Sequence, residues 1–275
     1  MPNVTSNGAS IPALGFGTFR MDDREVAEVL PEALRLGFRH VDTAQIYGNE
    51  TAVGTAIAAS GIPRAEIFLT TKVWVDKFAP ADFIPSVEES LRKLGTDHVD
   101  LLLLHWPGGS DIPREVQIDG LNKARAAGMT RHVGVSNYSS AQMREAAGIS
   151  AAPLVTNQVE YHPWLDQGAV LATAADLGMS VTAYYAMADG RSATDPTLAR
   201  IGARHGKTAA QVALRWQVQQ PGVITLSKTA KVKRLPENLA IFDFQLSDDE
   251  MVAIHALART DGRIVSPKEL SPAWD

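Results

Sequence analysis

The stretch VDLLLLHW, residues 99–106, decides the fold. It is a near-continuous apolar run that ends in a histidine and a tryptophan. A short run without alternating polar positions is typical of a strand in a parallel sheet whose outer face is covered by helices. The run therefore predicts an α/β protein with a parallel sheet, provided that similar runs recur at the spacing of one strand–helix unit.

Seven further runs of this kind recur along the chain. They are residues 13–19, 39–43, 67–74, 131–137, 154–161, 180–186 and 222–228. The stretches between them are rich in Ala, Leu, Glu and Arg, as expected for helices. Helix starts are marked by the capping-box pairs Ser139 with Gln142, Thr208 with Gln211, and Ser247 with Glu250. Eight units without a linker predict a single (β/α)8 barrel domain, a TIM barrel, over residues 1–275.

Two local features refine this prediction. The segment NVTSNGASIP, residues 3–12, places an Asn-Gly pair between two short extended pieces, which predicts a β-hairpin that caps the barrel floor. Pro31 lies inside the first helix-like stretch, where a proline predicts a kink or an interruption.

A doubly wound sheet that binds a dinucleotide is the alternative α/β architecture. It requires the motif G-x-G-x-x-G directly after the first strand. The segment GFGTFR supplies Gly15 and Gly17, but Arg20 stands at the third glycine position. The motif fails, so any dinucleotide must be held in another way.

Composition narrows the possible partners. The formal net charge of −5 argues against nucleic acid as a partner. The absence of cysteine excludes disulfides and thiol chemistry, and it fits a reducing cytoplasm. The N-terminus has no signal-peptide pattern, and no apolar run is long enough to span a membrane. We therefore expect a cytoplasmic protein without a membrane partner, and no residue cluster suggests a metal site.

Polar side chains stand where the predicted strands end. Asp42 and Tyr47 follow the second run, Lys72 ends the third and His105 ends the fourth, so all four share the C-terminal mouth of a barrel. Each has a plain structural explanation: Asp42 caps the next helix or forms an ion pair with Lys72, Tyr47 is an ordinary half-buried aromatic, and His105 is a core histidine. Those explanations do not predict which strand carries which residue type.

Six segments, in order over nearly the whole chain, resemble the aldo-keto reductase family. They are DTAQIYGNE, TTKVW, LLLLHWP, VGVSN, TNQVEYHP and SKTAKVKRLPEN. Within the family, the sequence is similar to the bacterial 2,5-diketo-D-gluconate and methylglyoxal reductases. The resemblance implies an NADPH-dependent reductase that converts small aldehydes and ketones to alcohols.

The resemblance assigns catalytic roles to Tyr47, Asp42, Lys72 and His105. A proton donor must lie within reach of the carbonyl oxygen that hydride delivery leaves negative, and Tyr47 takes that role. A phenol with a pKa near 10 is a weak acid, and the Lys72 ammonium, held by Asp42, is expected to lower that pKa. His105 is expected to orient the carbonyl as a neutral donor.

The resemblance also implies residues that bind cofactor and substrate. The cofactor residues are Gly17, Thr18 and Asp42, then Ser136, Asn137, Gln158 and Tyr184 at the nicotinamide, Lys228, Thr229 and Arg234 at the 2′-phosphate, and Glu237 and Asn238 at the adenine. The cluster of cations with a hydroxyl suits a 2′-phosphate and favours NADPH over NADH. The substrate residues are Phe19, Tyr47, Trp74, His105 and Trp106.

Three departures from the family pattern qualify these expectations. Tyr185 and Ala186 replace a serine and a proline after the seventh strand, and Thr229 replaces a serine after Lys228. The loop after His105 and the C-terminal tail are short, which suggests an open pocket for small or polar carbonyls. Two other functions stay open: a non-catalytic NADPH-binding regulatory subunit, and an aldolase that forms a Schiff base on Lys72. The expected oligomeric state is a monomer.

Overall fold

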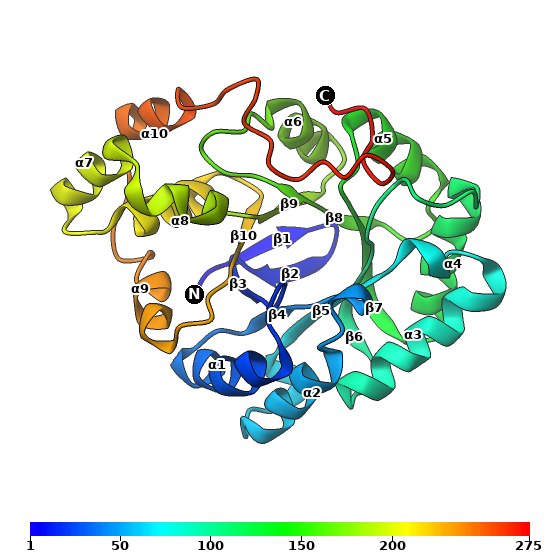
Figure 1. The fold of residues 1–275 in the computed structure, drawn as a ribbon. Helices are drawn as coiled ribbons and strands as arrows, with labels where there is room; N and C mark the ends of the chain where they lie inside the picture. Colours follow the sequence, from blue (N-terminus) through cyan, green and yellow to red (C-terminus); the bar gives the residue numbers. More distant parts are fainter.

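The eight apolar runs form eight parallel strands that close into a barrel in the computed structural model, which describes residues 1–275 (Figure 1). The strands are β3 (Leu14–Gly17), β4 (His40–Asp42), β5 (Phe68–Val73), β6 (Val99–Leu104), β7 (Thr130–Ser136), β8 (Leu154–Glu160), β9 (Ser180–Tyr184) and β10 (Val223–Ser227). They pair in chain order, and β10 closes the barrel against β3. The predicted (β/α)8 barrel is confirmed.

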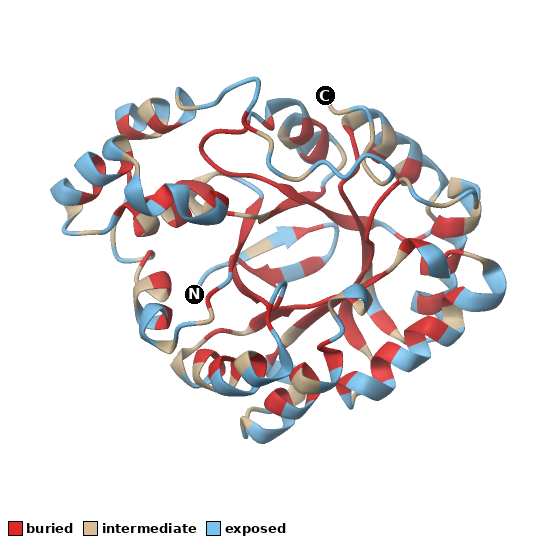
Figure 2. Ribbon diagram, in the orientation of Figure 1, coloured by how far each residue is buried: buried red, intermediate tan, exposed pale blue.

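Helices cover the outside of the barrel. They are α1 (Asp23–Leu36), α2 (Glu50–Ala59), α3 (Pro80–Leu94), α4 (Arg114–Ala126), α5 (Ser140–Ile149), α6 (Gly168–Asp176), α7 (Pro196–His205), α8 (Ala209–Gln219), α9 (Leu235–Leu239) and α10 (Asp248–His255). Short 3-10 turns lie at η1 (Gln45–Tyr47), η2 (Arg64–Glu66), η3 (Val75–Lys77), η4 (Ala188–Thr194) and η5 (Val232–Arg234). Figure 2 shows that the barrel strands are buried almost throughout, whereas the helices are buried on one side. None of the helices is long and apolar enough to cross a membrane.

The capping boxes predicted at helix starts are confirmed, whereas the interruption predicted as one possible effect of Pro31 does not occur. All three expected capping boxes form, at the starts of α5, α8 and α10. Pro31, in contrast, does not interrupt α1, which continues to Leu36. A proline removes one backbone hydrogen bond. Burial of an apolar face that includes Leu30 and Leu34 outweighs that loss.

The N-terminal hairpin closes one end of the barrel. Its strands, β1 (Asn3–Ser6) and β2 (Ala9–Pro12), pair antiparallel through a turn at Asn7 and Gly8, both with positive φ. The Asn7 amide donates to the carbonyl of Leu154 at the start of β8, at 2.7 Å. Ile11 is fully buried among side chains of the barrel interior. The hairpin therefore seals the floor, and the opposite end is the mouth.

A buried carboxylate also lies at the floor. Asp100, the second residue of β6, accepts a hydrogen bond from the Leu69 backbone N–H at 3.0 Å. The same carboxylate forms ion pairs with Arg64 at 2.8 Å and Arg131 at 3.3 Å. Three donors therefore neutralise one buried charge there.

Candidate active site at the barrel mouth

The ends of β4 and β5 bring Asp42, Tyr47 and Lys72 together. The fully buried Lys72 Nζ donates to Asp42 Oδ1 at 2.6 Å, to the Thr43 carbonyl at 2.8 Å and to the Tyr47 hydroxyl at 3.4 Å. Tyr47 reaches the lysine because it is the last residue of η1, which turns the chain directly after β4. Asp42 does not cap the following helix, since both of its oxygens accept hydrogen bonds inside the barrel.

His105 lies on the other side of the phenol. Its ring centroid is 5.7 Å from that of Tyr47 and 5.1 Å from that of Trp74, in edge-on contacts. The ring is buried, and its Nδ1 has no hydrogen-bond partner within the protein. The four residues that sequence reasoning grouped are thus neighbours at one mouth.

Burial controls the protonation of this group. Burial, together with the Lys72 charge, lowers the pKa of His105 well below its usual value, so the imidazole is neutral at pH 7. Burial and the Asp42 charge raise the pKa of Tyr47 well above its usual value. This direction is opposite to the one expected from the lysine alone, because burial and the Asp42 carboxylate both disfavour the charged phenolate. Tyr47 therefore keeps its proton at neutral pH.

The residues expected at the nicotinamide form one hydrogen-bonded network with this group. Gln158 donates to Asp42 Oδ2 at 2.8 Å, and the Ser136 hydroxyl donates to the Gln158 carbonyl at 2.7 Å. The Asn137 amide donates to the His105 carbonyl at 2.9 Å and accepts from the Tyr184 hydroxyl at 2.6 Å. Asn137 has a φ of 65°, a left-handed conformation that asparagine tolerates.

The basic segment after β10 has four exposed cations. Lys228, Lys231, Lys233 and Arg234 form no ion pair and no side-chain hydrogen bond, and the Thr229 hydroxyl accepts from the Lys231 backbone N–H at 3.0 Å. Unpaired cations beside a hydroxyl suit a phosphate group.

Other expected cofactor residues are placed nearby or already bonded within the protein. A Cβ on Gly17 would lie 4.0 Å from that of Lys228, and the Thr18 backbone N–H donates to the Asp42 carbonyl at 3.0 Å. Asn238 donates to the Ser227 hydroxyl at 2.7 Å, and Glu237 accepts from the Thr208 hydroxyl at 2.6 Å. To contact an adenine, the Asn238 and Glu237 side chains must change conformation or form a second hydrogen bond through the same atoms.

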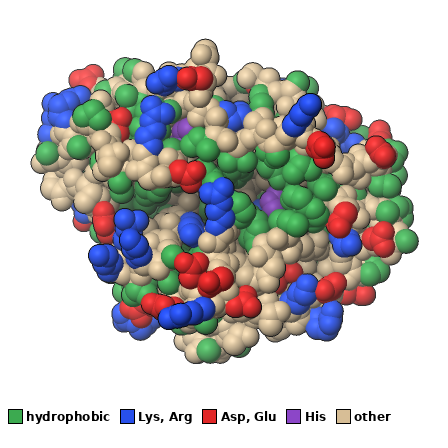
Figure 3. All heavy atoms as spheres, viewed as in Figure 1, with side chains coloured by type: hydrophobic (Ala, Val, Ile, Leu, Met, Phe, Trp, Pro, Cys, Tyr) green, Lys and Arg blue, Asp and Glu red, His purple; other side chains and the backbone are tan.

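Aromatic side chains surround the tyrosine and the histidine. The Phe19 ring lies 5.0 Å from that of Tyr47, and Trp106 lies 6.5 Å from Trp274 of the C-terminal tail. Phe19 is 41% exposed, whereas Trp106 is buried. Figure 3 shows a hollow near the middle of this face, bordered by hydrophobic side chains and by Lys or Arg side chains.

Sequence reasoning missed two loop contacts at this mouth. Arg20 lies over the rings of Phe19 and Tyr185 and forms an ion pair of 3.7 Å with Asp189, which joins the loops after β3 and β9. The tail after α10 runs along one side of the mouth, from α10 past α6 to α5, and brings Trp274 to Trp106 (Figure 1). The tryptophan in the segment PAWD, residues 272–275, was the one available signal.

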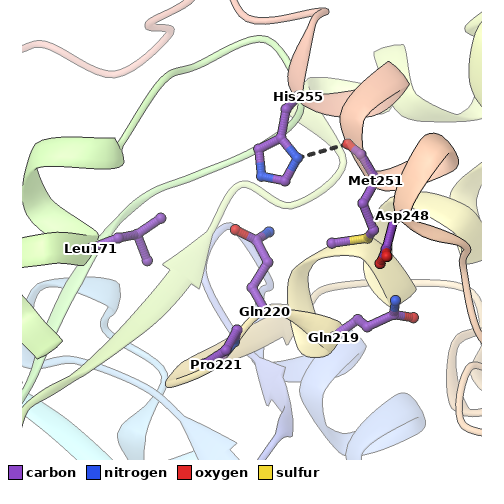
Figure 4. A pocket seen from close by; sticks show the side chains of 7 residues that line it. All are labelled: Leu171, Gln219, Gln220, Pro221, Asp248, Met251 and His255. Carbon is purple, nitrogen blue, oxygen red and sulfur yellow. Dashed lines mark hydrogen bonds between the residues drawn. The ribbon is translucent and has the colours of Figure 1, made fainter.

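A second cavity, of about 450 Å³, lies outside the barrel between α6, α8 and α10 (Figure 4). It is lined by Leu171, Gln219, Gln220, Pro221, Asp248, Met251 and His255. The two glutamine amides bond to the protein itself, to Leu246 and to Trp216 and Tyr161. None of the expected catalytic or cofactor residues lines this cavity, so it is separate from the mouth.

Fold and mouth together define the class, a (β/α)8-barrel protein whose mouth brings together a phenol, a lysine, a carboxylate and a neutral imidazole. A sequence model of the aldo/keto reductase family matches residues 13–259. The methylglyoxal reductase DkgB of Escherichia coli O157:H7 is 43% identical over 97% of this chain and 100% of its own length. The chain belongs to the aldo/keto reductase family and is an oxidoreductase.

Solved structures agree with this assignment. The crystal structure of a candidate 2,5-diketo-D-gluconic acid reductase B has a TM-score of 0.99 and 66% sequence identity, and the match covers 100% of this chain and 98% of that one. The aldo-keto reductase of Bombyx mori in complex with NADP has a TM-score of 0.90 and 32% identity, covering 97% of this chain and 95% of that one. Aldo/keto reductases use a nicotinamide cofactor, as the Bombyx mori complex illustrates.

Proposed function

We propose that this chain is an NADPH-dependent carbonyl reductase of small dicarbonyl compounds, such as methylglyoxal and 2,5-diketo-D-gluconate. The observation that carries the proposal is the Lys72 ammonium, which is shared between Asp42 and the Tyr47 hydroxyl inside an aromatic pocket. The names of the similar proteins, methylglyoxal reductase and 2,5-diketo-D-gluconic acid reductase, support the substrate class.

In this proposal each side chain has one task. The reduced nicotinamide supplies hydride to the carbonyl carbon. Tyr47 gives its proton to the carbonyl oxygen, since burial keeps the phenol protonated until a stronger base, the developing alkoxide, is beside it. Lys72 stabilises the resulting phenolate across 3.4 Å, while Asp42 fixes the lysine. His105 is neutral and donates a hydrogen bond that orients the carbonyl.

The cofactor would be held by groups at two ends of the mouth. Ser136, Asn137 and Gln158 offer amide and hydroxyl groups for the carboxamide, and Tyr184 offers a ring on which to stack. The cations Lys228 and Arg234, which lack acidic partners, suit the 2′-phosphate and therefore NADPH.

The test is oxidation of NADPH in the presence of methylglyoxal or 2,5-diketo-D-gluconate, with NADH as the control cofactor. We expect turnover of both substrates with NADPH and much less with NADH. Tight NADPH binding without turnover of any carbonyl compound would contradict the proposal and favour a non-catalytic role.

A further inference from the structure

The C-terminal tail carries an arginine that has no bonding partner in the protein. Arg263 forms no ion pair within 4.0 Å and no hydrogen bond, and its Nη1 is buried. The guanidinium carbon lies 3.6 Å from the centre of the Trp274 ring, which fixes the position of the side chain. A guanidinium carries five N–H donors, and a buried donor without an acceptor, such as Nη1 here, costs free energy.

The acidic groups near Arg263 are engaged elsewhere. Glu160, at the end of β8, is fully buried and accepts from the backbone N–H groups of Ile264 and Val265, both at 2.7 Å. It also bonds to His162 Nε2 at 2.9 Å. The Asp275 carboxylate accepts from the Ser140 N–H at the start of α5. Neither carboxylate therefore neutralises the arginine at bonding distance.

The position of Arg263 links it to the proposed site. The two residues after Arg263 are bound to Glu160, which lies opposite Tyr184 where β8 pairs with β9. The Tyr184 phenol bonds to Asn137, whose amide bonds to the His105 carbonyl. On the other side, the stacked Trp274 lies against Trp106. The guanidinium is thus held at the rim of the mouth, stacked on the aromatic side chains next to His105.

We propose that Arg263 recognises a carboxylate on the substrate, so that the enzyme prefers carbonyl compounds that carry an acid group. This proposal rests on the proposed function. A guanidinium matches the two oxygens of a carboxylate in a bidentate pair. A cofactor phosphate fits less well, because Lys228 and Arg234 already provide unpaired cations for phosphate.

The test compares 4-carboxybenzaldehyde with its methyl ester, two aldehydes that differ in one negative charge. Arg263→Gln removes the charge but keeps a planar side chain. Arg263→Lys keeps the charge but cannot form a bidentate pair with a carboxylate. The matched control is Arg259→Gln, which removes an exposed arginine on the same tail whose partner is Asp261. For Arg263→Gln we expect the KM of the acid to rise about tenfold to a hundredfold. The KM values of the ester and of NADPH should change less than about twofold. In Arg263→Lys, the KM of the acid should lie between those of the wild type and Arg263→Gln.

Equal losses for acid and ester would show a structural role and overturn the proposal. A rise confined to the KM of NADPH would assign Arg263 to the cofactor and overturn it as well. Calorimetric binding of the acid and the ester to the NADP⁺ complex gives a readout that needs no turnover. Tighter binding of the acid that disappears in Arg263→Gln supports the proposal even if the proposed reaction fails, and equal binding by both proteins refutes it.

Discussion

The two ends of the barrel each bury a carboxylate beside a cation, yet only at one of them does the cation also contact a phenol. At the floor, Asp100 accepts from Arg64, Arg131 and the Leu69 N–H, and the hairpin closes that end. At the mouth, Asp42 accepts from Lys72 and Gln158, and the lysine also reaches the Tyr47 hydroxyl. The difference is the third group at the mouth, the Tyr47 phenol. An ion pair becomes part of a site when its cation also contacts a group that can exchange a proton.

Removing that third group should have the largest effect. We expect Tyr47→Phe to lower kcat about a hundredfold to ten-thousandfold, because the proton donor is lost, while NADPH binding is retained. Steady-state kinetics and fluorescence titration measure the two quantities. Tyr138→Phe is the matched control, since this buried phenol has no hydrogen-bond partner. Equal activity of the two variants would remove Tyr47 from the mechanism.

The ion pairs at the two ends should also differ in their contribution to stability. Lys72→Met leaves Asp42 buried with Gln158 as its one side-chain partner, so we expect a loss of about 3–5 kcal/mol in the free energy of unfolding. Arg131→Met should cost only about 1 kcal/mol, because this arginine is half exposed and Arg64 and the Leu69 N–H remain on Asp100. Denaturant titration measures both. Similar losses would mean that the two pairs are equivalent.

Acidification should reveal what the two ends share, a buried neutral histidine. Burial lowers the pKa of His40, the first residue of β4, to about 4. In the unfolded chain this histidine binds a proton near pH 6.5, whereas in the folded protein it does so only near pH 4. The free energy of unfolding should therefore fall as the pH drops from about 6.5 to 4, and His40 alone should account for about 3 kcal/mol of that loss. His105 contributes with the same sign.

Unfolding free energies at pH 7 and pH 4.5 test this linkage. We expect His40→Gln to lose less stability between these two pH values than the wild type does. His255→Gln, at an exposed position, is the control and should retain the wild-type difference. If the wild-type protein is equally stable at both pH values, the inference that these buried histidines are neutral in the folded protein is wrong.

The smallest expected effect on the kinetics concerns the rim of the mouth. Lys228→Ala or Arg234→Ala should raise the KM of NADPH about tenfold to a hundredfold, because a charge-assisted bond to the 2′-phosphate is lost. The KM of NADH should stay within about twofold. Parallel kinetics with both cofactors measure the ratio, and equal changes would separate these cations from cofactor preference.

Much of the fold could be predicted from the sequence because parallel strands leave a strong local signal. VDLLLLHW became β6 because a strand covered on both faces can be apolar throughout, and the Asn7–Gly8 turn followed from backbone preference. The interruption considered at Pro31 did not occur, because the effect of a proline depends on the packing of the whole α1 face. The pKa direction of Tyr47 also misled, since desolvation cannot be read from residue types.

The candidate site was predictable where strand ends determine it. Asp42, Lys72 and His105 follow buried strands and must meet at one mouth, and the resemblance supplied their roles. Arg263 and Trp274 follow no strand, so their places could not be predicted in this way. The path of the tail depends on contacts with distant residues. The ion pair of Arg20 with Asp189 could not be predicted from the sequence either, because it joins two separate loops.

The bonds from Glu160 to the tail have a consequence for the order of events during synthesis. The carboxylate is buried in the barrel, but its partners Ile264 and Val265 lie 104 and 105 residues further along the chain. A nascent chain that has all eight strands still leaves this charge without those donors. The mouth therefore reaches its final form only after the C-terminus has left the ribosome, so premature termination just before the tail would yield a closed barrel with an unfinished mouth.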